Sequence, residues 1–149
     1  GHIIGTAAYP FLKVHEGNES YWLMTDAFNK MGYFEFISDK YVTVLLENHW
    51  DDLFLDRLRF MKKLSWRLVT TGRIAFGEID YDRHKSEMLL PEYTKEFKNI
   101  PYAEVALGIE NILTVGRIDV FWRLTHLNPG VKVTDLTNFG VRARYAINF

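Results

Sequence analysis

Residues 139–149, FGVRARYAINF, contain the strongest structural signal in this sequence. Every odd-numbered residue from Phe139 to Phe149 is apolar. The residues between them are small or polar, namely Gly140, Arg142, Arg144, Ala146 and Asn148. A period of two is typical of a β-strand with one apolar and one polar face. Because a tilted strand of about 9 to 11 residues crosses a bilayer, and barrels carry aromatic residues at both interfaces, the pattern predicts a transmembrane strand.

Similar alternation, of varying clarity, recurs along the chain. The segments that we interpret as strands are residues 2–9, 20–28, 41–50, 64–76, 102–110, 118–125 and 139–149. Alternation is weakest in the first two, and Pro10 must end the first. The predicted fold class is therefore all-β, an antiparallel up-and-down transmembrane β-barrel segment of about six or seven strands.

The connections between these segments differ in length. The link at 111–116 is short, the link at 78–100 is long and charged, and the link at 128–138 is intermediate. Bacterial barrels have short periplasmic turns and longer external loops. We therefore expect the two longer links outside and the 111–116 turn in the periplasm. Residues 51–63 are the exception and are expected to form an irregular or briefly helical periplasmic connection.

Composition limits the classes of function. With 18 basic and 19 acidic residues and a pI near 6.6, the chain lacks the positive field that nucleic-acid binding requires. The absence of cysteine excludes disulfides and thiolate metal sites. No apolar run approaches the about 18 residues of a transmembrane helix, a test that does not detect transmembrane strands.

The chain opens at Gly1 without an initiator methionine or signal peptide. We therefore expect residues 1–149 to be a single transmembrane β-barrel region, the C-terminal part of a larger barrel. Residues 139–149 and 3–7 are then expected to pair with strands outside this sequence, because an unpaired edge in hydrocarbon leaves amides without partners.

Alternation alone does not say which face points outward, and a soluble barrel or sandwich would turn the apolar face into its core. The aromatic pairs Trp66 and Phe76, and Phe139 and Phe149, are each ten residues apart, which matches an apolar band about 25 Å tall. Predicted lipid-facing and girdle residues are Trp50, Trp66, Phe76, Trp122, Phe139, Tyr145 and Phe149. The same face carries Val42, Leu46, Leu68, Val105, Leu107, Val120 and Ile147.

The polar face carries pairs of charges on successive strands in an order that sets acids beside bases, as the pairing of charges inside a narrow barrel requires. This predicted lumenal charge ladder consists of Arg67, Arg73, Glu104, Glu110, Arg117, Arg123, Arg142 and Arg144. Charge matching also predicts the register of the 102–125 hairpin. Paired residue numbers should sum to 227, which sets Glu104 beside Arg123 and Glu110 beside Arg117.

Candidate chemistry is sparse. The five histidines are scattered, and His49 with Glu47 on one strand face is the best pair, for which a lumenal polar network is a simpler role than a ligand or base. No serine has a G-x-S-x-G context. We expect no catalytic residues, no metal and no cofactor. Arg57, Arg59, Lys62 and Lys63 either contact anionic lipid headgroups or form a solvated turn.

Several blocks of the sequence resemble the C-terminal barrel of the DUF5686 family, outer-membrane proteins of Bacteroidota. They are residues 17–21 (GNESY), 27–31 (AFNKM), 35–42 (EFISDKYV), 101–104 (PYAE), 108–113 (GIENIL) and 117–124 (RIDVFWRL), the last being the most specific. Family members usually also carry an N-terminal carboxypeptidase-regulatory-like domain. The resemblance implies the bacterial outer membrane as the location, and it supplies no catalytic residues.

These observations lead to a first hypothesis of a non-enzymatic outer-membrane barrel that acts as a pore, transporter part or assembly scaffold. Its expected partners are outer-membrane lipid and lipopolysaccharide, the barrel-assembly machinery through the C-terminal strand, and the remaining barrel strands of the same protein or another copy. A second hypothesis is a soluble β-barrel or sandwich binding module with an apolar cavity. A third is an outer-membrane enzyme with its catalytic groups on missing strands.

Overall fold

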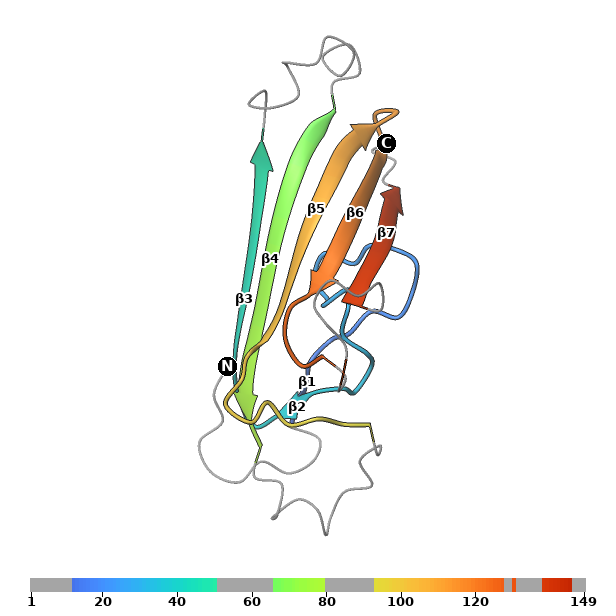
Figure 1. Cartoon of the computed structure of the whole chain (residues 1–149). Helices are drawn as coiled ribbons and strands as arrows, with labels where there is room; N and C mark the ends of the chain where they lie inside the picture. Colours follow the sequence, from blue (N-terminus) through green and yellow to red (C-terminus); the bar gives the residue numbers. More distant parts are fainter. Residues whose placement is uncertain (1–11, 51–65, 80–92, 128–129, 131–137, 146–149) are drawn as a thin grey trace.

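The computed structural model describes residues 12–50, 66–79, 93–127, 130 and 138–145. The elements in this part of the chain are all strands, and they form two antiparallel sheets. The larger sheet has five strands in sequence order (Figure 1): β3 (Lys40–Trp50), β4 (Arg67–Glu78), β5 (Tyr102–Ile112), β6 (Gly116–Arg123) and β7 (Phe139–Tyr145). The smaller sheet pairs β1 (Lys13–Val14) with β2 (Ile37–Ser38). No helix of the described residues is long and apolar enough to span a membrane.

Five of the predicted strands are confirmed, because β3 to β7 lie within or close to the segments 41–50, 64–76, 102–110, 118–125 and 139–149. The alternating pattern is strongest in these segments, and their neighbours in sequence are also their neighbours in the sheet. Residues 2–9 and 51–63, and with them Arg57, Arg59, Lys62 and Lys63, lie outside the described residues, as do Ile147 and Phe149.

The prediction of a strand at residues 20–28 is wrong. This stretch forms bends and isolated bridges instead of a ladder. The Asn18 side chain accepts a hydrogen bond from the Ser20 amide at 2.9 Å and donates to the Trp22 carbonyl at 2.6 Å. Such local side-chain bonds offer the backbone an alternative to a sheet and favour turns.

The predicted register of the β5–β6 hairpin is confirmed. Glu104 is paired with Arg123 and Glu110 with Arg117, so partner numbers sum to 227 up to an irregularity between Glu110 and Ile112. A tight turn follows, in which the Thr114 amide donates to the Asn111 carbonyl at 3.3 Å. This turn lies at the end of the sheet where β7 ends, since Gly116 pairs with Tyr145 (Figure 1).

The two faces of the sheet differ in what covers them. Residues Lys13–Ser38, which we call the inner segment, lie against one face, which we call the inner face (Figure 1). Buried apolar side chains of the segment, of the sheet and of the link before β5 pack together there. They form two clusters, one of Phe28, Met31, Phe36, Ala75, Phe97 and Tyr102, the other of Leu23, Ala106 and Phe121. The opposite, outer face has no covering element among the described residues.

Strands β3 and β7 are the two edges of the described sheet. The outer edge of β7 is partly occupied, because the Leu23 amide donates to the Ala143 carbonyl at 2.7 Å and the Ala143 amide to the Tyr21 carbonyl at 3.3 Å. The sequence did not predict this contact. No second strand pairs with β3 among the described residues, and residues 3–7 lie outside them.

Candidate functional site: the inner face of the sheet

A buried ion pair forms the centre of the inner face. An Nη1 hydrogen of Arg73 points to Glu104 Oε1 at 3.2 Å, and both side chains are 1% exposed. Arg73 also donates to the carbonyl oxygens of Ala27 at 2.7 Å and Thr25 at 3.1 Å. A buried pair of charges needs such further hydrogen bonds to offset desolvation. The inner segment supplies them through its backbone.

Glu104 binds the inner segment in the complementary way. Its carboxylate accepts hydrogen bonds from the backbone amides of Asn29 at 2.8 Å and Lys30 at 2.9 Å, and from the Tyr102 hydroxyl at 2.9 Å. Arg73 therefore binds carbonyl groups of the irregular backbone at residues 25–30, and Glu104 binds amide groups of the same stretch. Hydrogen bonds to charged groups are the stronger ones, so these two side chains fix the position of the segment.

A second buried pair links β6 to the inner segment. Arg123 makes a two-pronged contact with Glu35, with Nη1 to Oε2 at 3.0 Å and Nη2 to Oε1 at 2.8 Å. Lys95 Nζ donates to the same carboxylate at 2.9 Å. Burial by itself raises the pKa of Glu35, but the hydrogen bonds from Arg123, the Gly32 amide and Lys95 outweigh it, so the pKa lies below its usual 4.5.

Strand β7 contributes a third anchor. Arg142 Nη2 donates to the carbonyl oxygens of Asn29 at 3.1 Å and Asn18 at 3.3 Å. In return, Lys30 Nζ of the inner segment donates to the Phe139 carbonyl at 3.0 Å. Burial and then the positive charges of Arg142 and Arg123 lower the pKa of Lys30 from 10.5.

A separate polar cluster lies nearer the β5–β6 turn and is made by the strands alone. Arg117 on β6 donates to both carboxylate oxygens of Glu47 on β3 at 2.9 Å, and its Nε donates to Asp119 at 2.7 Å. Strands β4 and β5 lie between Glu47 and Arg117, a span of about 14 Å at the usual strand spacing. Gly108 sits beneath this contact, and a Cβ there would collide with the Asp119 carboxylate.

The predicted pair His49 and Glu47 is found together. His49 Nε2 lies 3.0 Å from Glu47 Oε1, and its Nδ1 lies 2.8 Å from Glu110 Oε1 on the next strand but one. The described residues contain no group of three or more His, Cys, Asp or Glu side chains placed to hold a metal ion. The pair therefore extends the polar network of Glu47 and Arg117.

The eight charges of the predicted ladder share the inner face, at different depths. Arg73, Glu104, Arg117 and Arg123 are buried, Glu110 and Arg142 are half-buried, and Arg67 and Arg144 are exposed. The paired charges of the predicted register lie opposite each other on β5 and β6. Their close ion pairs, however, are made with other residues. Glu104 binds Arg73, Arg123 binds Glu35, and Arg117 binds Glu47 and Asp119. A lumenal role stays a prediction.

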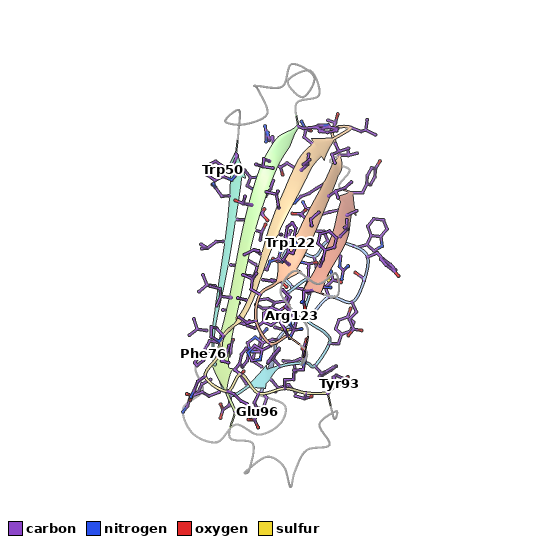
Figure 2. The ribbon with its side chains drawn as sticks, viewed as in Figure 1. Trp50, Phe76, Tyr93, Glu96, Trp122 and Arg123 are labelled. Atoms are coloured by element: carbon purple, nitrogen blue, oxygen red, sulfur yellow. The ribbon has the colours of Figure 1, made fainter. Side chains whose placement is uncertain are left out.

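The described members of the predicted girdle belong to the outer face or its ends. Trp50 and Phe76 lie at opposite ends of the sheet, and Trp122 lies between them (Figure 2). Trp50, Trp66, Phe76, Trp122 and Phe139 are half-buried, and Tyr145 is exposed. Trp122 and Phe139 meet edge to face at 5.4 Å. Contact of these side chains with lipid stays a prediction.

Sequence reasoning missed the residues of the inner segment that complete the site. Asn18, Asn29 and Glu35 are buried polar residues far from any alternating pattern. In the sequence His15 is one of five scattered histidines, yet in the structure it is 1% exposed and lies 3.0 Å from the Ser38 hydroxyl. Burial, and then the charge of Lys13, lower the pKa of His15 to about 4. No local signal distinguishes these residues from those of a solvated loop.

A cavity of about 350 Å³ opens where β4 ends. Its charged lining comes from Asp39, Lys40, Glu78, Glu96 and Lys98, so acids and bases are mixed. The described residues of its lining include no serine or histidine that could act as a nucleophile or base. The cavity therefore gives no support to a catalytic site in the described residues.

The comparisons with known proteins add no relative. No protein-family model, curated protein or solved structure matches this chain. The described part of the chain is all-β, and its larger antiparallel sheet buries charges on one face and exposes apolar side chains on the other.

Proposed function

We propose that the five-stranded sheet is part of the wall of a transmembrane β-barrel in the bacterial outer membrane, with a non-enzymatic role as a pore, transporter part or assembly scaffold. The outer face would contact lipid and lipopolysaccharide. The inner face would line the lumen, and further strands of the same protein or another copy would complete the wall.

The observation that carries this proposal is the inversion of burial between the two faces. On the inner face Arg73 and Glu104 are 1% exposed and Asp119 is 0% exposed. On the outer face Val42 is 61% exposed and Leu46 is 66% exposed. Charged side chains are almost never the most buried residues of a water-soluble domain unless paired, and soluble proteins rarely expose a continuous apolar face. A barrel wall in lipid carries apolar side chains on its outer face and polar side chains on its inner face.

Strand length adds support. Strands β3, β4 and β5 contain 11, 12 and 11 residues, which suffices for a tilted strand to cross the hydrocarbon core. Their outer side chains include no charge between Val42 and Trp50, nor between Leu68 and Phe76. The soluble alternative with an apolar cavity would need these side chains in its interior, and the structure places them opposite the covered face.

The proposal is tested by locating the full-length protein in a bacterium with an outer membrane. We expect it in the outer-membrane fraction, resistant to extraction with carbonate at high pH. Recovery in the periplasm or cytoplasm as soluble protein would reject the proposal and favour a soluble module.

Single cysteines give a residue-level test, because the chain contains none. Oxygen dissolved in lipid should accelerate the spin relaxation of a nitroxide label at Leu107. A water-soluble nickel complex should instead accelerate the relaxation of a label at Leu113 in the β5–β6 turn. Both residues are exposed leucines, so the pair is matched in residue type. Equal acceleration of the relaxation of both labels by the nickel complex would contradict a lipid-facing wall.

A further inference from the structure

We infer that the inner segment is a displaceable plug which closes the interior of the barrel, and that its release opens a path that favours small anions. This inference rests on the proposed function, because an interior exists only if the sheet belongs to a closed wall. It goes further by assigning a gating role to residues 13–38 and a class of solute to the opened path.

The first argument is how the segment is attached. Four sheet side chains hold it by hydrogen bonds to its backbone or to Glu35, and each comes from a different strand, β4, β5, β6 or β7. They are Arg73, Glu104, Arg123 and Arg142. By contrast, few backbone hydrogen bonds join the inner segment to the sheet. The two at Ala143 are examples. Release of the segment would break side-chain contacts and leave the ladders of β3 to β7 intact.

The second argument is the internal structure of the segment. Gly17 and Gly32 approach so closely that a Cβ on Gly17 would collide with the Gly32 carbonyl. Between them, the Asn18 amide nitrogen donates to Asn29 Oδ1 at 2.7 Å, and the Asn18 backbone amide donates to the Phe28 carbonyl at 2.9 Å. Residues 18–31 therefore form a closed loop with its own hydrogen bonds, which can move as one unit.

The third argument concerns what the loop covers. Release of the loop would expose the guanidinium groups of Arg73 and Arg142 against the single carboxylate of Glu104, a local net charge of +1 from two positive groups and one negative group. Arg123 keeps its contact with Glu35, which lies outside the loop. The polar cluster nearer the turn is internally paired, through Arg117 with Glu47 and Asp119. Arginine-lined constrictions attract anions and repel cations. Small anions such as chloride or phosphate are the expected solutes.

Removal of the loop tests the inference directly. Deletion of residues 18–31 joins Gly17 to Gly32, whose backbones already touch, so the wall and the rest of the segment need not move. With full-length protein in planar lipid bilayers, the deletion should raise potassium chloride conductance at least tenfold over wild type. The reversal potential in a salt gradient should show anion preference.

A milder pair of variants separates attachment from folding. Glu35→Gln weakens the contact with Arg123 without altering the wall, and hydrogen bonds to charged groups are strong enough for open events to become about tenfold more frequent. Glu19→Gln is the control, since Glu19 is exposed and accepts a hydrogen bond from Tyr33 within the same segment. It should behave as wild type.

A reversible lock provides the opposite manipulation. Trp22 and Ala143 are bridge partners, so the double change Trp22→Cys and Ala143→Cys places two thiols where a disulfide can form. In the Glu35→Gln background, oxidation should abolish the extra openings and reduction should restore them.

The outcomes distinguish the two proposals. Wild-type protein outside the outer membrane would reject the proposed function and the plug together. Protein that inserts normally, with wild-type conductance in both the loop deletion and Glu35→Gln, would reject the plug alone. Cation preference of the opened path would overturn the assignment of small anions.

Discussion

The inner and outer faces of one sheet follow opposite rules in this molecule. Alternate residues of β4 and β5 are either buried beneath the inner segment, as Arg73 and Glu104 are, or exposed and apolar, as Ile74 and Leu107 are. In a water-soluble sandwich, the covered face would be the apolar one. The difference teaches that the covered face here buries paired and hydrogen-bonded charges beside its apolar clusters, while many apolar side chains of the other face stay exposed.

The largest effect is expected from breaking the buried ion pair. Arg73→Ala leaves the Glu104 carboxylate buried without its guanidinium, which should lower the free energy of unfolding by about 3 to 5 kcal/mol. Arg67→Ala is the matched control on the same strand and face, because its side chain is 56% exposed, and it should cost less than about 1 kcal/mol. Urea unfolding in lipid vesicles, followed by tryptophan fluorescence, measures both. Equal losses would mean that the two ends of the inner face do not differ.

A charge on the outer face gives the next largest effect. Leu107→Arg, in the middle of β5, should destabilise the vesicle-inserted protein by about 2 to 4 kcal/mol. The same substitution at Leu113, in the turn, should cost about 1 kcal/mol or less because it lies near an interface. The same unfolding assay applies. If Leu107→Arg were neutral, the outer face would contact water.

Substitutions at two glycines test how tightly each face of the sheet is packed. Gly108→Ala forces the Asp119 carboxylate aside on the inner face, and overpacking of this kind costs about 1 to 3 kcal/mol. Gly72→Ala on the outer face meets no atom within 4 Å and should be neutral or stabilising by about 0.5 kcal/mol. Their difference in unfolding midpoint checks whether only the inner face is packed. A larger loss at Gly72 would contradict the assignment of faces.

The smallest expected effect depends on pH and concerns the inner segment. Because the pKa of His15 is about 4 in the folded state against 6.5 normally, the unfolded chain binds more protons between these values. Stability should therefore fall by about 2 kcal/mol as the pH drops from 7 to 5. Protonation of Glu35 adds little in this range, since its pKa lies below 4.5. His15→Gln should remove most of the pH dependence, and an unchanged slope would place the titrating group elsewhere.

The sequence by itself determined the strands of the five-stranded sheet. Period-two alternation predicted β3 to β7 and the separation of Leu107 from Glu104 onto opposite faces, because side-chain direction in a strand depends only on parity. Charge matching predicted the β5–β6 register, although the charges concerned make their ion pairs elsewhere. The register was right because a one-residue slip would exchange the two faces and a two-residue slip would set like charges side by side.

Only the tertiary structure decided what fills the inner face. Residues 20–28 gave a weak strand signal, and their true partners lie far away in sequence, as in the bond from Arg73 to the Ala27 carbonyl. The partner of Arg123 is Glu35 on the inner segment, and no periodic pattern connects the two. Alternation shows which way a side chain points, whereas its partner depends on which distant backbone the fold brings above it. That choice is made by long-range packing, so it cannot be found from local sequence.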